Sequence, residues 1–122
     1  MVSHRDTIDF LNRRRLRQAE RIQFRLTEAS EACKRIIEMI VQDHAPKRIW
    51  QWGSLVYTSR FTEVSDIDIG IEGLTDPHAI FEIYDKAEEL TSLPLDIIEL
   101  EKIEPEFAEL IRRRGVTVYG DP

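Results

Sequence analysis

No proline or glycine occurs from Ser3 to Ala45, a segment that makes up about a third of this 122-residue chain. Apolar residues recur along it at intervals of three and four, which is the spacing of one helix face. A single helix of that length would extend about 60 Å, beyond the diameter of a domain of this size. The segment must therefore either project or break. Its apolar positions are Ile8, Leu11, Ala19, Ile22, Leu26, Ala29, Cys33, Ile36 and Ile40.

Local capping signals favour a break in this segment. Ser3, with Asp6 three residues later, is a candidate N-cap for its beginning. Thr27, followed by Glu28 and Glu31, offers a second N-cap and an acidic first turn. We therefore predict two helices, with a break or bend near residues 24–27.

Charge is distributed unevenly between the two ends of the chain. Residues 1–25 hold seven arginines and three acidic residues, a net +4, so the remainder holds 10 bases and 20 acids, a net −10. This asymmetry indicates a separate functional surface. We therefore divide the chain into an N-terminal helical arm, residues 1–25, and a domain of residues 26–122. The arginines of residues 13–17 fit three alternatives: a solvated helix face, an acidic protein partner, or nucleic acid, which the overall charge of −6 disfavours.

The segment 66–72 reads D-I-D-I-G-I-E, in which three isoleucines alternate with Asp66, Asp68 and Gly70. This period of two predicts a half-buried strand with both aspartates on one face. Two ionised carboxylates so close together repel each other unless a cation or hydrogen-bond donors lie between them. Mg²⁺ is the natural cation, because it prefers oxygen ligands and leaves coordination positions open for substrate phosphates.

A second motif precedes this strand. Gly53 and Ser54 follow the apolar run 49–52, where a strand is expected to end. A glycine allows backbone N–H groups to approach a ligand closely, and the serine adds a hydroxyl donor. Such a turn suits a phosphate group.

The remaining segments predict an α/β (α+β) fold with a small mixed sheet packed against helices. A short helix is expected at residues 54–60, and a longer one after Pro77 that buries Phe81. The last helix, 105–114, is expected to bury Phe107 and Leu110. Asp96 is a lone acid inside an apolar run. The predicted strands are residues 47–52, 66–72, 93–100 and 116–119.

The order Gly53-Ser54, eleven residues, Asp66-Ile67-Asp68 resembles the signature of the DNA polymerase beta-like nucleotidyltransferases. The length resembles the minimal nucleotidyltransferases, which typically pair with a helical toxin partner. The resemblance covers roughly residues 27–120 and implies a palm-like fold for them. The N-terminal helical extension, residues 1–25, lies outside the resemblance.

The resemblance also implies the site and the reaction. Two Mg²⁺ ions would be held by Asp66, Asp68 and Asp96, and Gly53 and Ser54 would hold the β- and γ-phosphates of ATP. The reaction would transfer AMP to a partner protein, as expected of the antitoxin in a toxin–antitoxin pair. For Asp96, the alternative is a strand-end acid that accepts hydrogen bonds from backbone N–H groups.

The chain departs from the family pattern after Gly-Ser. Many members carry arginines there, whereas this chain has Leu55, Val56 and Tyr57, and its first arginine is Arg60. Arg60 either compensates in phosphate binding or is an ordinary loop arginine. The loop before Asp66 also lacks the frequent glycine. The alternative function is therefore a catalytically inactive module that neutralises its partner by binding alone.

Other residue types point to structure more than to chemistry. Trp50 and Trp52 fit core positions better than base stacking, and Cys33 fits a small core residue. The chain has no apolar run of about 18 residues and no secretory h-region, so we expect a cytoplasmic protein without a membrane partner. Self-association through residues 1–25 remains an alternative to partner binding. The histidines His4, His44 and His78 are expected at the surface.

Overall fold

The computed structural model describes residues 1–121, which form three α-helices and one four-stranded sheet. The mixed α/β architecture predicted from the sequence is confirmed. In chain order the elements are α1 (His4–His44), β1 (Arg48–Trp52), β2 (Ile67–Glu72), α2 (Ala79–Leu90), β3 (Leu95–Glu99), α3 (Pro105–Arg114) and β4 (Val116–Tyr119). Three short 3₁₀ turns are η1 (Gly53–Leu55), η2 (Thr58–Arg60) and η3 (Leu100–Lys102).

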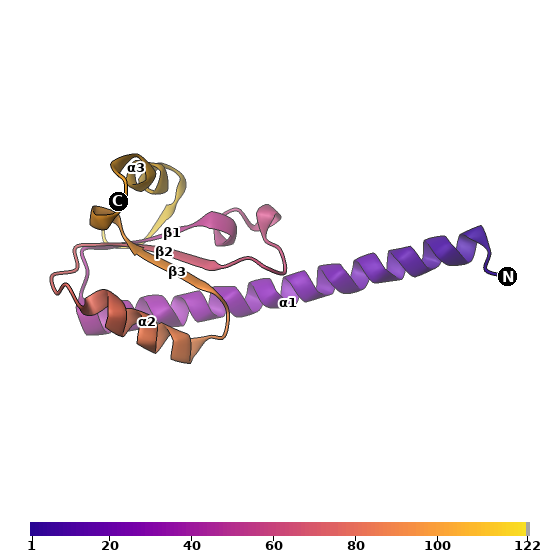
Figure 1. Ribbon diagram of the computed structural model, residues 1–122, viewed down its shortest axis with the longest axis horizontal. Helices are drawn as coiled ribbons and strands as arrows, with labels where there is room; N and C mark the ends of the chain where they lie inside the picture. The colour runs from indigo at the N-terminus through magenta and orange to yellow at the C-terminus, as the bar shows by residue number, and fades with distance from the viewer. Residues whose placement is uncertain (122) are drawn as a thin grey trace.

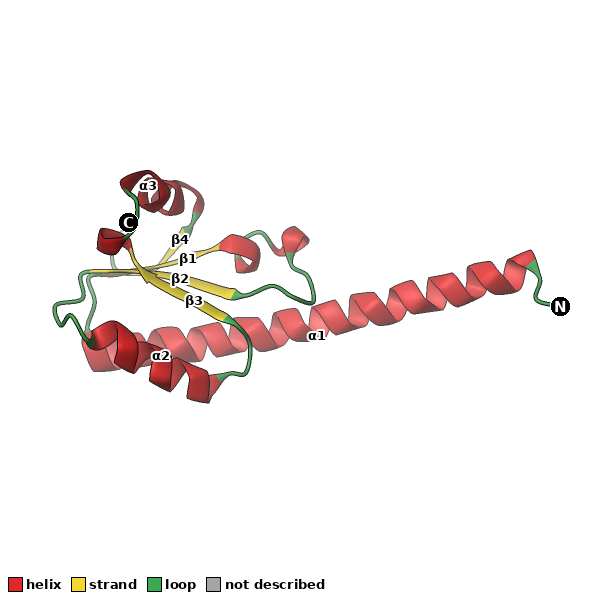
Figure 2. Ribbon diagram, in the orientation of Figure 1, coloured by secondary structure: helices red, strands yellow, loops and turns green. Residues whose placement is uncertain are grey.

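The sheet has the strand order β3-β2-β1-β4. β1 runs antiparallel to β2 and β4, whereas β2 and β3 are parallel and are joined through α2, as a parallel pair requires. Helices α1 and α2 cover one face of the sheet and α3 lies on the other (Figure 1 and Figure 2). Each residue of a strand therefore faces either the α1–α2 layer or the α3 layer.

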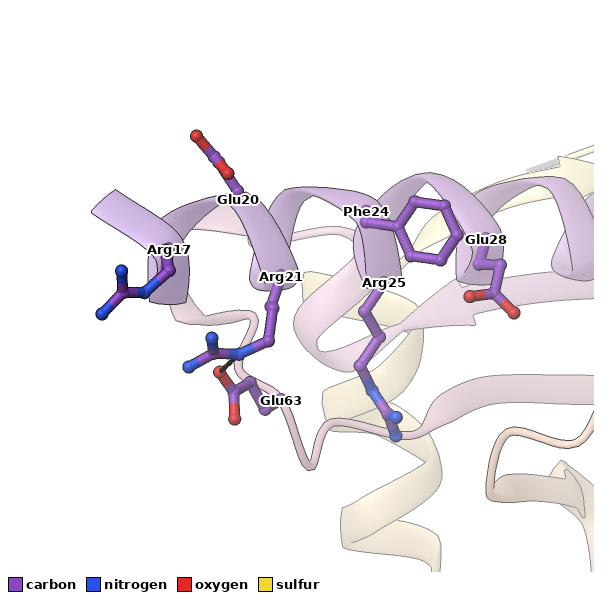
Figure 3. A pocket seen from close by; sticks show the side chains of 7 residues that line it. All are labelled: Arg17, Glu20, Arg21, Phe24, Arg25, Glu28 and Glu63. Carbon is purple, nitrogen blue, oxygen red and sulfur yellow. Dashed lines mark hydrogen bonds and ion pairs between the residues drawn. The ribbon is translucent and has the colours of Figure 1, made fainter. Parts of the chain in front are cut away.

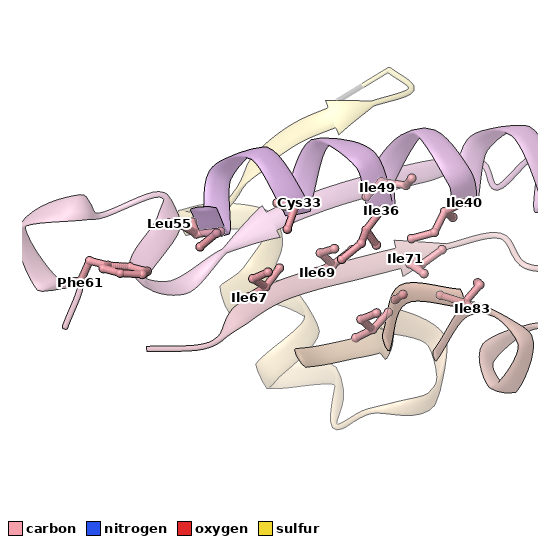
Figure 4. Close-up of a cluster of buried hydrophobic side chains, with 14 residues drawn as sticks. Cys33, Ile36, Ile40, Ile49, Leu55, Phe61, Ile67, Ile69, Ile71 and Ile83 are labelled. Carbon is pink, nitrogen blue, oxygen red and sulfur yellow. The ribbon is translucent and has the colours of Figure 1, made fainter. Parts of the chain in front are cut away.

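The main core lies between the sheet and the α1–α2 layer (Figure 4). The three isoleucines of β2 are fully buried there, which confirms the strand predicted from their alternation. Cys33 of α1 lies in the same core, as predicted. Burial, with a smaller contribution from the charge of Asp68, raises the pKa of its thiol to about 11. Cys33 is therefore a protonated core residue and not a nucleophile.

The second face of the sheet is anchored to α3 by a buried carboxylate. Glu72 accepts a hydrogen bond from Trp50 Nε1 at 2.7 Å and ion-pairs at 3.3 Å with Arg48 and with Arg112 of α3. Three donors satisfy this buried charge, which would otherwise be costly. Trp50 is buried in the adjoining apolar cluster, so its predicted core position is confirmed. That cluster contains Trp50, Leu100, Ala108 and Ile111.

Helix α1 runs unbroken for 41 residues, so the predicted break near residues 24–27 is wrong. The capping box of Ser3 and Asp6 is present at its beginning. Thr27, however, donates its hydroxyl to the carbonyl of Gln23 inside the helix and caps nothing. Tertiary contacts stabilise the helix across the predicted break, because Arg25 donates to the carbonyl of Ser65 at 3.2 Å. Ile22 and Leu26 also pack on the main core.

The first 20 residues of the chain are all exposed and project from the body as the free end of α1 (Figure 1). Apolar side chains on this projection include Leu16, which is 64% exposed, and Phe10. An open groove of about 670 Å³ lies where the helix leaves the body, and the pair Arg21–Glu63 spans it at 3.3 Å (Figure 3). Its lining residues are Arg17, Glu20, Arg21, Phe24, Arg25, Glu28 and Glu63.

Several smaller predictions are corrected. Residues 54–60 do not form one helix, because the turns η1 and η2 replace it. Phe81 is 66% exposed and does not join the core. His44 is largely buried beneath Glu82, whereas His4 and His78 are exposed as predicted. Among residues 1–121, no helix is both long enough and apolar enough to cross a membrane.

We predict that deleting residues 1–20 changes the free energy of unfolding by less than about 0.5 kcal/mol, because every deleted side chain is exposed. Ile36→Ala, in the fully buried part of the same helix, should lower it by about 2 to 5 kcal/mol. Urea denaturation of both variants measures the difference. A deletion as destabilising as Ile36→Ala would contradict the account, since residues 1–20 would then contribute to the core.

Candidate active site

The end of β1 turns at Gly53, and the structure requires glycine there for two reasons. Gly53 has φ +76°, a conformation that side-chain-bearing residues rarely adopt. A Cβ on this residue would also lie 2.2 Å from Oδ2 of Asp68. The turn is closed by the N–H groups of Val56 and Tyr57, which donate to the carbonyl of Gly53 at 3.1 and 3.2 Å. The predicted phosphate turn and the predicted acidic strand are therefore in direct contact.

The predicted acids gather beside this turn. Asp68 of β2 pairs with Trp52 across the antiparallel ladder and with Asp96 across the parallel ladder. Asp68 and Asp96 therefore occupy one register position on neighbouring strands, on the face opposite the buried isoleucines. Asp66 precedes β2 and is exposed. The structure thus brings together the glycine turn and the first residues of β2 and β3, which are far apart in the sequence.

The surroundings of Asp68 and Asp96 disfavour the ionised form of their carboxyl groups. Burial, followed by the charges of Asp96 and Asp66, raises the pKa of Asp68 to about 7. Burial and the charge of Asp66 also raise the pKa of Asp96. Within residues 1–121, no hydrogen bond or ion pair compensates the side chains of these three aspartates. The backbone-satisfied alternative for Asp96 therefore gains no support from the structure. A concentration of uncompensated carboxylates is typical of a functional site.

The donor set suits a hard cation, although no site is preassembled. Among residues 1–121, no three histidine, cysteine, aspartate or glutamate side chains are grouped closely enough to hold a metal ion by themselves. The three aspartates nonetheless offer unpartnered carboxylate oxygens, which are the ligands that Mg²⁺ prefers. Mg²⁺ commonly takes one or two carboxylates and completes its shell with water and substrate phosphates. The residues present are therefore compatible with Mg²⁺ that arrives together with a phosphate ligand.

The loop before Asp66 makes its turn without a glycine. Phe61 is buried in the main core at the beginning of the loop. Ser65 Oγ accepts a hydrogen bond from the N–H of Thr62 at 2.9 Å, and Thr62 Oγ1 accepts one from Val64 at 3.2 Å. The two hydroxyls stabilise the turn that the family's glycine would otherwise permit.

A cleft of about 300 Å³ opens on the other side of the Gly53–Ser54 turn, between η1 and α3. The Trp52 ring meets the Phe107 ring edge to face at 5.4 Å, and the Trp52 Nε1 is buried without a partner in the described chain. Trp52 is therefore a cleft wall and not a full core residue. Phe107 and Leu110 are more than a third exposed and line the same cleft, contrary to prediction. The cleft is lined by Trp52, Gly53, Ser54, Tyr57, Arg60, Phe107, Leu110, Ile111, Arg114 and Gly115.

Arg114 lines this cleft although it is not among the residues predicted for the site. In the sequence it is one of three arginines in the last turn of a helix, a position that the helix dipole alone explains. Its backbone carbonyl accepts a hydrogen bond from Tyr57 Oη at 3.0 Å, which joins the end of α3 to the segment after the Gly-Ser turn. Only the tertiary packing of α3 brings Arg114 near Ser54, so no local sequence signal could have identified it. Arg60, which was predicted, lines the same cleft.

The raised pKa of Asp68 predicts that this group's contribution to stability is lost as pH rises from about 4 to about 7. In that range Asp68 binds more protons in the folded state than in the unfolded state, so its contribution to the free energy of unfolding falls with pH. We expect a loss on the order of 1 kcal/mol, because the group is partly exposed to solvent. Denaturation at several pH values should show a flatter profile for Asp68→Asn. Asp85→Asn on α2 should keep the wild-type slope, and an equal slope in all three proteins would contradict the prediction.

Several solved structures share this fold. A chain of a toxin–antitoxin complex with AMP-PNP matches with a TM-score of 0.57 and 22% identity, covering 71% of this chain and 73% of that one. A chain of the toxin–antitoxin complex MntA-HepT matches with a TM-score of 0.54 and 21% identity, covering 75% and 73%. A complex of tri-AMPylated Shewanella oneidensis HEPN toxin with MNT antitoxin gives 0.55 and 21%, covering 76% and 73%. Such identities establish a common fold.

Family membership is established by sequence. No curated protein matches the chain. The family described as Polymerase beta, Nucleotidyltransferase matches residues 34–121, a range that includes Gly53, Ser54 and the three aspartates. This range is well over half of the chain, and its fold agrees with the described sheet and helices. The chain therefore belongs to the polymerase beta nucleotidyltransferase family.

Proposed function

We propose that this protein transfers AMP from ATP to a hydroxyl group of a partner protein. The observation that carries the proposal is the contact of the Gly53 turn with Asp68, with Asp96 in register on the next strand. This arrangement offers a phosphate-binding turn and a set of carboxylates at one place on the sheet. Family membership supports nucleotidyl transfer as the reaction class.

The reaction is a displacement at the α-phosphorus of ATP. A bond forms from the acceptor oxygen to the α-phosphorus, the bond from that phosphorus to the bridging oxygen breaks, and pyrophosphate leaves with the electron pair. The acceptor proton must be removed, and Asp96 is the group proposed to take it. Asp96 lies in register beside Asp68 on the neighbouring strand, so its carboxylate is close to the proposed reaction centre.

Asp66, Asp68 and Asp96 are proposed to hold two Mg²⁺ ions. When bound, Mg²⁺ supplies a Lewis acid that neutralises negative charge on the phosphates and on the acceptor oxygen. The protein's own contribution is to fix the donors. The buried isoleucines fix β2 in the sheet, and the turn at Gly53 would offer backbone N–H groups and the Ser54 hydroxyl to the β- and γ-phosphates.

We propose a helical toxin as the partner. The structures that share this fold include an MNT antitoxin in complex with a tri-AMPylated HEPN toxin, and the proposal extends that relation to this chain. The exposed end of α1 is proposed as a contact surface, because it carries apolar side chains and a net +4 over residues 1–25. Such a surface would complement an acidic, partly apolar partner. Self-association through the same helix is the competing arrangement.

The alternative function is a binding module that neutralises its partner without catalysis. The specific observation in its favour is the absence of arginines directly after Gly53-Ser54, which would leave ATP more weakly held. The observation against it is the retention of all three aspartates without compensating partners, since a pure binding module gains nothing from that destabilising arrangement.

We predict that ATP labelled at the α-phosphate, with Mg²⁺, labels the protein encoded by the neighbouring gene. Asp68→Asn should reduce labelling by at least about 100-fold, because it removes a central carboxylate of the site. The variant should still form the complex in size-exclusion chromatography. Asp85→Asn, which changes an acid on the opposite face of the sheet, is the matched control and should label at the wild-type rate.

The same assay separates enzyme from module. If the partner is neutralised equally by wild type and Asp68→Asn and never becomes labelled, the catalytic proposal is wrong.

A deletion of residues 1–20 tests the contact surface, since the shortened protein should retain ATP binding and lose either the partner or self-association. Unchanged complex formation by the deletion variant would remove α1 from the proposal.

A further inference from the structure

The cleft beside Ser54 is lined by two arginines from segments that are distant from each other in the sequence. Arg60 belongs to η2, and Arg114 is the last residue of α3. The positions directly after Gly-Ser, where many family members carry arginines, are Leu55, Val56 and Tyr57. Two arginines from elsewhere in the sequence therefore line the same cleft as Gly53 and Ser54.

Tyr57 connects the two arginines. The guanidinium of Arg60 lies 5.5 Å from the centre of the Tyr57 ring, a cation–π distance. The hydroxyl of Tyr57 donates to the backbone carbonyl of Arg114 at 3.0 Å. One aromatic side chain therefore positions a cation on its face and the end of α3 at its hydroxyl.

The two guanidinium groups are available for a ligand. The neighbouring Arg112 ion-pairs with Glu72 at 3.3 Å, and Arg113 lies 3.9 Å from Glu109. Within residues 1–121, neither Arg60 nor Arg114 has an acidic partner or a guanidinium hydrogen bond. Both arginines are exposed, and the cleft that they line also has apolar walls, which include Phe107 and Leu110.

The order of the strands indicates which part of a nucleotide would reach this cleft. Across the sheet the order is Asp96 on β3, Asp68 on β2, the Gly53 turn after β1, and then the cleft between η1 and α3. Attacking and leaving oxygens lie roughly in line in phosphoryl transfer. With the acceptor at Asp96 and the α-phosphate at Asp68, the leaving group points across Gly53 and Ser54 toward Arg60 and Arg114.

We propose that Arg60 and Arg114 form the binding site for the terminal phosphates of the nucleoside triphosphate and for the departing pyrophosphate. This inference rests on the proposed nucleotidyl transfer and names the residues that hold its leaving group. Guanidinium groups suit this role because each can donate two parallel hydrogen bonds to a phosphate. The ligand class is a polyphosphate, and the base makes no contact in this cleft.

The test is calorimetry with three probes in the presence of Mg²⁺: ATP, AMP and inorganic tripolyphosphate. Arg60→Ala and Arg114→Ala should each weaken ATP and tripolyphosphate binding about tenfold, the size expected for a charged hydrogen-bonded contact near solvent, and leave AMP binding unchanged. Arg113→Ala is the matched control, because it lies on the same helical turn outside the cleft and should change binding less than about twofold. Circular dichroism establishes that each variant is folded. Arg114→Lys should recover only part of the affinity, since it restores the charge without the bidentate geometry.

The possible results distinguish a failure of the proposed phosphate site from a failure of the proposed AMP transfer. Equal weakening of ATP and AMP would place the base or ribose in the aromatic cleft and overturn the proposal. Unchanged ATP affinity in both alanine variants would also overturn it, while AMP transfer to a partner could still stand. If the arginine variants lose tripolyphosphate but the wild type transfers no AMP to any partner, the phosphate site stands and the proposed function fails. A wild type that binds neither ATP nor tripolyphosphate would overturn both.

Discussion

The parallel pairing of β2 and β3 places Asp68 beside Asp96, and no cation in the described chain lies against either of them. Two carboxylates at one register position repel, and burial adds to the cost of ionising Asp68. The strand tolerates this cost because its other face carries three fully buried isoleucines that pack against α1 and α2. A strand that is stabilised on one face and strained by like charges on the other is suited to hold a cation with a phosphate ligand.

The α3 layer is held to the sheet by a different acidic residue, Glu72. Its carboxylate accepts a hydrogen bond from Trp50 and forms ion pairs with Arg48 and Arg112. This contact attaches α3 to the sheet and thereby positions Phe107 against Trp52 and Arg114 beside the Gly-Ser turn. The two acidic sites of β2 therefore have opposite roles. Glu72, near one end, is neutralised and structural, whereas Asp68, near the other, is left uncompensated. Both residues lie on the same face of β2. Their positions near opposite ends of the strand place Glu72 against α3 and Asp68 beside the Gly53 turn.

Much of the fold and half of the site could be predicted from sequence because the relevant signals are local. The alternation around Asp68 and the glycine before Ser54 each follow from two or three neighbouring residues. The continuity of α1 could not be predicted, because the apparent cap at Thr27 is overridden by contacts with a loop that lies about 40 residues away in the sequence. The role of Arg114 was hidden for the same reason, since only the packing of α3 brings it to the cleft. The sequence thus indicated the three carboxylates and Arg60 of the candidate site, and the tertiary structure added Arg114.

The Gly53 turn and the three aspartates are proposed to form one site for Mg²⁺ and nucleotide. The most direct measurement is calorimetric titration with a non-hydrolysable ATP analogue, with saturating Mg²⁺ and with none. The account predicts that Mg²⁺ increases the affinity of the wild type at least about tenfold, because metal and phosphates complete each other's coordination. It also predicts that Asp66→Asn/Asp68→Asn removes this dependence and binds the metal-free analogue at least as tightly as the wild type, since the like-charge repulsion is gone. Equal and weak binding by both proteins, with or without Mg²⁺, would contradict it.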